Sequence, residues 1–131
     1  MMFGFDNEEH TVFKEACNFL VKNHVSLTYW FPLTPLPGTS LYKRLKNQGR
    51  LKDVKWWLSS NRKVYYLRFT GTKMEEGMFF KNFYHHYRRF YSLRNIIRRI
   101  LFPPQPRFLI IIFLNLLYRR KLTHQTLISE Y

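Results

Sequence analysis

The chain has 131 residues, of which 46% are hydrophobic, so it is long enough to form one domain with a core. Its single cysteine excludes a disulfide framework and is typical of a protein from the reducing cytoplasm. The most apolar run, residues 108–118, is shorter than the about 20 residues that span a bilayer. The acidic first ten residues lack the pattern of a signal peptide. The net charge of +14 favours an anionic partner.

The first thirty-one residues predict a strand, a helix and a second strand. Residues 1–5 form an apolar run typical of a short buried strand, and Asp6 or Asn7 is the expected cap of a helix that extends to about Asn23. Residues 25–31 are β-branched and aromatic, which favours a second strand. This order implies a βαβ unit with parallel strands and a right-handed crossover.

A stiff loop follows the second strand. Residues 32–38, PLTPLPG, contain three prolines, which fix φ and lack an N–H group, so the chain must leave the strand here. Gly38 permits a sharp turn, and Thr39 or Ser40 can cap a helix over residues 41–47. Parallel α/β folds bind ligands at such loops, and a rigid turn without a ligand is the alternative.

The next segment has no helical pattern. Trp56 and Trp57 are the expected packing anchors of an irregular stretch over residues 51–63. Residues 64–69 favour a further strand. Thr70 is the expected cap of a long helix.

Aromatic residues recur at helical spacing after Thr70 and predict a buried stripe rather than a surface that stacks on bases. The adjacent arginines then face water or acidic partners. Ser92 is expected to restart the helix, prolines at 103, 104 and 106 break it, and residues 108–121 predict a last helix, buried against the stripe or lying on a membrane surface. The stripe comprises Phe80, Phe83, Tyr84, Tyr87, Phe90 and Tyr91.

Several short motifs occur in one order: GFDNEE at 4–9, LTPLPGT at 33–39, GRL at 49–51 and RFYS at 89–92. This order resembles the C-terminal part of radical S-adenosylmethionine proteins of the cobalamin-binding type, over about residues 1–100. The resemblance implies an α/β to α+β fold. Its first part, residues 1–52, would be a partial βαβ unit of a (β/α) barrel with the LTPLPGT loop. Residues 53–131 would be a mainly helical accessory tail of unassigned function.

The resemblance also implies site residues. In such barrels the ends of the fifth and sixth strands contact the adenosine part of the cofactor. No catalytic residue is predicted. No metal-binding residue is predicted either, because adjacent histidines such as His85 and His86 point about 100° apart on a helix and chelate one ion poorly. The residues assigned to the cofactor side are Gly4, Asp6, Leu33, Pro35, Pro37 and Gly38.

Intact members of that family hold a [4Fe–4S] cluster through a Cys-x3-Cys-x2-Cys loop. This chain has only Cys17, at a helical core position, and cluster irons require several thiolates. We therefore expect no cofactor in the chain itself, although S-adenosylmethionine, the cluster and cobalamin belong to the intact family. The sequence predicts a C-terminal fragment, truncated and inactive alone, whose partner is the missing N-terminal half of the enzyme.

An alternative rests on charge. Residues 81–121 hold ten Lys or Arg and no acidic residue. Such an asymmetry is typical of proteins with anionic partners. The alternative is a small basic module in the cytoplasm, or peripheral at the membrane, that binds nucleic acid or anionic lipid weakly and without sequence preference. Steep salt dependence of binding would distinguish this module from the enzyme fragment.

Overall fold

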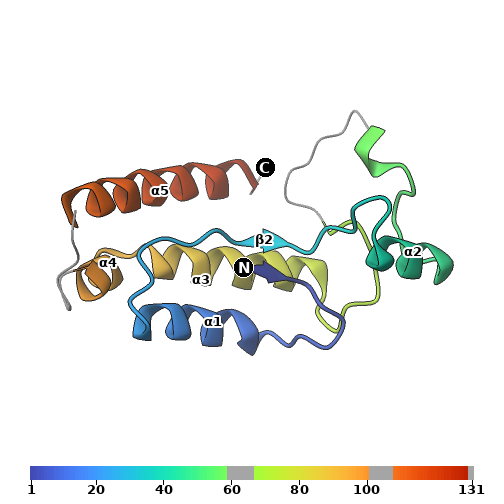
Figure 1. The fold of residues 1–131 in the computed structure, drawn as a ribbon, viewed down its shortest axis with the longest axis horizontal. Helices are drawn as coiled ribbons and strands as arrows, with labels where there is room; N and C mark the ends of the chain where they lie inside the picture. Colours follow the sequence, from blue (N-terminus) through green and yellow to red (C-terminus); the bar gives the residue numbers. More distant parts are fainter. Residues whose placement is uncertain (59–66, 101–107, 130–131) are drawn as a thin grey trace. The chain divides into compact units, whose positions relative to one another are not determined.

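Figure 1 shows the fold in a computed structural model, which describes residues 1–58, 67–100 and 108–129, with side chains up to Leu122 in the last helix. The described chain is mixed α/β and mostly helical, with a two-stranded parallel sheet. In chain order the elements are β1 (Met2–Phe3), α1 (Thr11–Lys22), β2 (Phe31–Pro32), α2 (Ser40–Asn47), a 3-10 turn (Trp56–Leu58), α3 (Glu76–Phe90), α4 (Leu93–Ile100) and α5 (Phe108–Ser129).

Two compact units interleave along the sequence. Unit 1 comprises Met1–Glu8 and Trp30–Glu76, and unit 2 comprises Glu9–Tyr29 and Gly77–Tyr131. The two strands of the predicted βαβ unit thus belong to unit 1, whereas the helix between them belongs to unit 2. The division into residues 1–52 and 53–131 concerns domain boundaries and stays a prediction.

The sheet of unit 1 is parallel, as predicted, but much shorter. Met2 pairs with Phe31 and Phe3 with Pro32, and the N–H of Leu33 donates to the carbonyl of Phe3 over 2.6 Å. Pairing ends here because Pro32 has no N–H and because Gly4 has φ +113°, which turns the chain away. The predicted strands over 1–5 and 25–31 were therefore too long.

Helix α2 confirms the predicted cap. The side-chain oxygen of Thr39 accepts a hydrogen bond from the N–H of Tyr42 at 3.2 Å, which satisfies one of the free donors at the helix start. The helix buries Leu45 in a small apolar cluster with Leu33 and Phe69. The cluster fixes the start of the proline-rich loop against α2.

The segment after α2 differs from the prediction. Within the described residues, the strand expected at 64–69 reduces to one antiparallel bridge between Leu51 and Phe69; residues 64–66 lie outside them. Thr70 does not cap a helix, because its N–H and hydroxyl both donate to the carbonyl of Arg50. Helix α3 begins only at Glu76.

The two tryptophans in this segment behave differently. The indole N–H of Trp56 donates to the carbonyl of Pro35 at 3.2 Å, so Trp56 anchors the proline-rich loop as predicted. Trp57 is 43% exposed and packs its ring edge against Trp56 at a centroid distance of 6.0 Å. Trp56 is half-buried and Trp57 is exposed, so only Trp56 serves as an anchor.

Unit 2 has an aromatic core that confirms the predicted stripe. Of its six members only Phe80 is half-buried, and Phe79, which the prediction omitted, is fully buried. Phe13 of α1 packs against Phe79 and Phe83 with ring centroids 5.3 and 6.1 Å apart. Helix α1 begins at Thr11 rather than after Asp6 or Asn7. Phe19, expected on the apolar face of this helix, is exposed.

Arg99 of α4 is the exception to a solvated basic tail. Its side chain is fully buried, and its guanidinium lies 3.7 Å from the centroid of the Phe90 ring. The prediction that Arg99 faces water or acidic partners was wrong. It donates hydrogen bonds to the carbonyls of Val25, Ser26, Phe90 and Asn95 and to the side-chain oxygen of Asn115.

Desolvation by burial lowers the pKa of Arg99 to about 10, so the group remains a cation at neutral pH.

Residues 25–29 are held by hydrogen bonds from side chains of unit 2. The hydroxyls of Tyr87 and Tyr91 donate to the carbonyl of Thr28 at 3.2 and 2.8 Å. Because these backbone groups already have partners, they do not extend the sheet.

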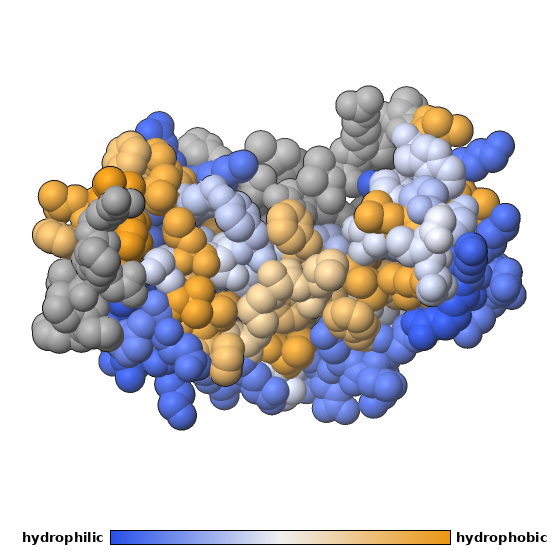
Figure 2. All heavy atoms as spheres, viewed as in Figure 1, coloured by the Kyte–Doolittle hydropathy of each residue, from blue (hydrophilic) through white to orange (hydrophobic). Residues whose placement is uncertain are grey.

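Helix α5 confirms the predicted last helix but exposes most of its apolar residues. Asn115 and Leu122 are buried, whereas Leu109, Ile110 and Phe113 are more than half exposed. Figure 2 shows apolar side chains gathered at the surface over the first part of this helix. Among the described helices, none combines the length and apolarity needed to cross a bilayer.

Candidate functional site

The residues assigned to the cofactor side lie at one edge of unit 1. Gly4 and Asp6 follow β1, and residues 33–38 follow β2. Because the strands are parallel, their carboxyl ends meet at the same edge, which is where such folds bind ligands. The structure therefore brings the two predicted segments together.

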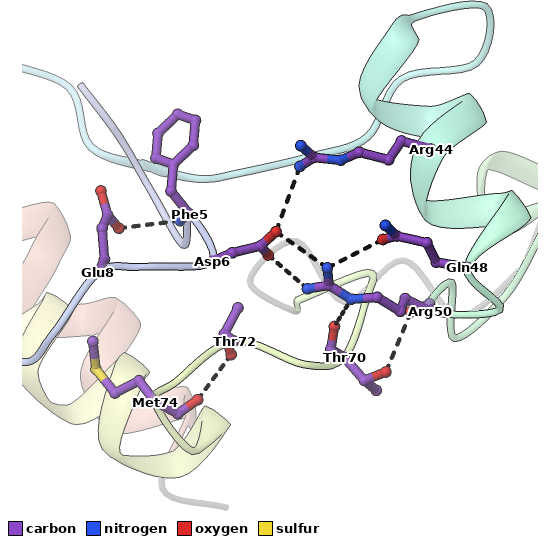
Figure 3. Close-up of polar contacts among 9 residues, drawn as sticks. All are labelled: Phe5, Asp6, Glu8, Arg44, Gln48, Arg50, Thr70, Thr72 and Met74. Carbon is purple, nitrogen blue, oxygen red and sulfur yellow. Dashed lines mark hydrogen bonds and ion pairs between the residues drawn. The ribbon is translucent and has the colours of Figure 1, made fainter.

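At this edge the first turn is fixed by Glu8. One carboxylate oxygen of Glu8 accepts from the N–H groups of Gly4 and Phe5 at 2.6 and 3.2 Å (Figure 3). The sequence suggested that Glu8 stabilises the first turn of a helix. This was wrong, because the carboxylate closes a turn that precedes helix α1.

The second segment divides into a buried and an exposed part. Leu33 and Pro35 are buried, whereas Pro37 and Gly38 are exposed. The hydroxyl of Thr34 donates to the carbonyl of Pro32 at 3.1 Å, which holds the loop at its start. Of the predicted residues, Leu33 and Pro35 thus form the framework of the edge rather than its surface.

Asp6 is the centre of an ion-pair network (Figure 3). Its two carboxylate oxygens accept from Nη2 and Nη1 of Arg50 at 2.6 and 3.1 Å, and Nη2 of Arg44 lies 3.5 Å away. Nε of Arg50 also donates to the carbonyl of Thr70 at 2.8 Å. Arg50 lies just after α2, so its side chain links the turn after β1 to the segment that contains Thr70.

The hydrogen bond from Arg50 lowers the pKa of Asp6, and the charges of Arg50 and Arg44 act in the same direction. A carboxyl with a lowered pKa contributes stability above its ordinary value, near 3.8, and loses it as the pH falls through the lowered value. Asp6 is 36% and Arg50 21% exposed, so water screens the pair, and we expect less than about 1 kcal/mol from it.

Two glycines allow this network to be tested. A Cβ added at Gly71, where φ is +84°, would lie 2.8 Å from Nε of Arg50, whereas a Cβ at Gly38, where φ is +86°, meets nothing within 4 Å. Both alanine substitutions strain the backbone, but only Gly71→Ala displaces Arg50. We expect carbon NMR titration to show the pKa of Asp6 returning toward 3.8 in Gly71→Ala and staying low in Gly38→Ala. Equal pKa values in the two variants would contradict the network.

The exposed apolar side chains at this edge were not predicted. Phe5 is 48% exposed and follows β1, and Leu36 is 55% exposed and lies in the proline-rich loop. Sequence reasoning passed over Phe5 because it read residues 1–5 as one buried strand. A strand that alternates its side chains would have placed Phe3 and Phe5 on the same face, and it is the turn at Gly4 that separates them.

Phe5 and Leu36 are exposed apolar side chains at this edge, and side chains of this kind suit an apolar, planar base. The carboxylates of Asp6 and Glu8 already have partners in the structure.

The chain does not fit an iron–sulfur cluster. Cys17 is 1% exposed, and burial raises the pKa of its thiol, which disfavours the thiolate that iron requires. Among the described residues, no group of three or more His, Cys, Asp or Glu could hold a metal ion. His85 and His86 instead pack edge to face with centroids 4.8 Å apart.

Comparison with known proteins gives one relative and no family assignment. No protein-family model and no solved structure matches the chain. Over 122 residues the chain is 26% identical to bacteriochlorophyllide d C-12(1)-methyltransferase of Chlorobaculum tepidum. The match covers 93% of this chain and 26% of that protein, so the chain spans about a quarter of the length of its relative.

This relative overturns the function expected from the sequence. The expectation was a C-terminal fragment of a radical enzyme without activity of its own, with a basic module for nucleic acid or membranes as the alternative. Neither agrees with a match to a methyltransferase that runs through 93% of the chain.

Proposed function

We propose that this chain serves methyl transfer from S-adenosylmethionine, with the edge of unit 1 facing the adenosine part of the cofactor. The observation that carries the proposal is the similarity to a named methyltransferase over 93% of the chain. The resemblance of the GFDNEE and LTPLPGT motifs to radical S-adenosylmethionine proteins, whose late barrel strands contact this cofactor, supports the same assignment. By analogy with the relative's name, the methyl acceptor would be a chlorophyll-type pigment.

Each part of the edge has a separate task in this proposal. S-adenosylmethionine supplies the methyl group when it is bound. Phe5 and Leu36 offer apolar contacts to its adenosine part, and the positive φ of Gly4 lets the backbone turn close to it. Trp56 holds the loop through Pro35. Because the loop is stiff before the ligand arrives, little entropy is lost on binding.

None of the residues described here has a role in a radical step. Radical cleavage of S-adenosylmethionine depends on a cluster that Cys17 cannot hold, so the residues described here bind and orient the cofactor. Asp6 and Arg50 are positioning residues for the turn at Gly4. Arg50 donates hydrogen bonds to the carboxylate of Asp6, two residues after Gly4, and to the carbonyl of Thr70. Their loss is expected to weaken binding by loosening that turn.

The test is equilibrium dialysis of the chain against radiolabelled S-adenosylmethionine. We expect saturable binding, and about a tenfold loss of affinity in Phe5→Ser and in Leu36→Ser, because each removes about half the burial energy of a large apolar side chain. Leu58→Ser is the matched control, since Leu58 is 71% exposed in unit 1 but belongs to neither of the two segments that form this edge. No saturable binding, or an equal loss in the control, would contradict the proposal.

A further inference from the structure

Unit 2 contains a cavity that the proposed methyl-transfer role does not use. Its volume is about 420 Å³, within the range of about 300–1,000 Å³ that is typical of small-molecule sites. It lies where the end of α3 and the turn that follows it approach α5. The residues that line it are His85, Arg88, Arg89, Tyr91, Arg119 and Leu122.

The rim of this cavity is cationic. Among the described residues that line it, three are arginines and none is acidic. Among the residues that the structure describes, Arg88 and Arg89 form no ion pair. A guanidinium can bind a carboxylate or a phosphate with two parallel hydrogen bonds, so two such groups beside one cavity favour an oxyanion.

The wall of the cavity is apolar. Tyr91 is 1% and Leu122 4% exposed. The hydroxyl of Tyr91 donates to the carbonyl of Thr28 at 2.8 Å and accepts from its N–H at 3.3 Å. That hydroxyl thus has its partners on Thr28, and Tyr91 is one of the residues that line the cavity. Burial raises the pKa of Tyr91 to about 12, so the ring carries no charge at neutral pH that would repel an anion.

The position of one rim arginine is fixed. Nη1 of Arg119 donates to the carbonyl of Tyr91 at 3.4 Å, which keeps the guanidinium beside the cavity. The neighbouring Tyr118 packs its ring against Tyr91 at a centroid distance of 5.8 Å. The last part of α5 is thus held against the turn after α3, and the cavity is formed before any ligand binds.

A second cavity of about 390 Å³ reaches Arg89. Lys22 and Arg98 line this second cavity, and none of its described lining residues is acidic. Arg89 is common to both cavities, so Lys22 and Arg98 add to the positive potential near Arg89.

We propose that the cavity formed by Arg88, Arg89, Tyr91 and Leu122 binds an organic anion. The carboxylate or phosphate group of the ligand lies against the arginines, and its apolar body lies against Tyr91 and Leu122. The site is independent of the cofactor edge, because all of its residues belong to unit 2.

The experiment is calorimetric titration of the full chain at physiological salt with benzoate, phenyl phosphate and inorganic phosphate. We expect one saturable site for benzoate or phenyl phosphate, and the stronger of the two identifies the anionic group. Inorganic phosphate is expected to bind at least about tenfold more weakly, because it gains nothing from the apolar wall. Equal affinity for inorganic phosphate would contradict the wall, and no saturable binding of any probe would overturn the site.

Variants distinguish a site from diffuse charge. The double variant Arg88→Gln/Arg89→Gln is expected to lose at least about tenfold in affinity, since each lost charge-assisted contact costs about 1.5–3 kcal/mol. Lys81→Gln/Arg94→Gln removes the same charge at two exposed positions that line neither cavity, and it is expected to change affinity less than about threefold, through screened long-range attraction. Equal losses in the two double variants would overturn the proposal.

A third variant keeps the charge and removes the geometry. Arg88→Lys/Arg89→Lys retains both cations but not the planar fork that binds an oxyanion with two hydrogen bonds. We expect it to bind at least about threefold more weakly than the unaltered chain, with an unchanged thermal melting curve because both arginines are exposed. Full retention of affinity would show attraction by charge alone and would contradict a built site.

Discussion

Replacement of Arg99 by methionine is expected to destabilise unit 2 by about 3–5 kcal/mol, the cost of removing one partner from a buried charged network. The substitution leaves five acceptors without this donor: four backbone carbonyls and the side-chain oxygen of Asn115. A buried acceptor that loses its partner costs about 1–3 kcal/mol. Since domains are stable by only about 5–15 kcal/mol, unit 2 would be near its unfolding limit.

The measurement is urea denaturation followed by circular dichroism. Arg98→Met is the matched control, because Arg98 precedes Arg99 in α4 but is exposed, and its loss is expected to change stability by less than about 0.5 kcal/mol. Arg99→Lys is expected to resemble Arg99→Met, since an ammonium has three donors and cannot reach five acceptors. If Arg99→Met and Arg98→Met unfold at the same urea concentration, the buried network does not stabilise the fold.

The burial of Arg99 was partly predictable. Ile96 lies three residues before Arg99, and residues three apart share a helix face, so an apolar face of α4 that contains Ile96 also contains Arg99. What the sequence could not show is the partner. The carbonyls of Val25 and Ser26 are 74 and 73 residues away, and backbone acceptors leave no signature in side-chain identity.

Asn115 gives a clearer signal in retrospect. It interrupts the most apolar run of the chain, and helix α5 turns this one polar residue inward and most of the apolar ones outward. Its side-chain oxygen accepts from Arg99 at 3.0 Å, and its amide donates to the carbonyl of Ser26 at 3.1 Å. A buried polar residue is stable only with such partners, so a polar position in an apolar helix indicates a specific contact.

At the edge of unit 1 the sequence predicted the two segments that meet better than it predicted which of their side chains are exposed. The prolines and Gly38 correctly indicated a stiff loop after a strand, and the parallel pairing placed this loop beside Gly4. Which side chains face outward depends on the turn at Gly4 and on the ion pair between Asp6 and Arg50, 44 residues apart. Hydrophobic periodicity carries no information on such a pair, so Phe5 and Leu36 were missed.

Replacement of Phe83 by alanine is expected to destabilise unit 2 by about 3–5 kcal/mol, the usual cost of truncating a buried phenylalanine. Phe83 is fully buried at the centre of the aromatic core. Its ring packs against those of five residues, with centroids 5.4–6.3 Å away. These are Phe13, Phe79, Phe80, Tyr84 and Tyr87. The substitution removes all of these contacts and leaves a cavity that close-packed neighbours fill only in part.

The control for Phe83→Ala is Met78→Ala in the same helix, because Met78 is 51% exposed and its loss is expected to cost less than about 1 kcal/mol. Phe13→Ala adds a double-mutant cycle, and a coupling of about 0.5–1.5 kcal/mol is expected for two rings packed edge to face. The aromatic stripe of α3 then belongs to the core and leaves the adjacent exposed arginines to bind ligands. A stable Phe83→Ala variant with lost anion binding would reverse this assignment and make the stripe itself the recognition surface.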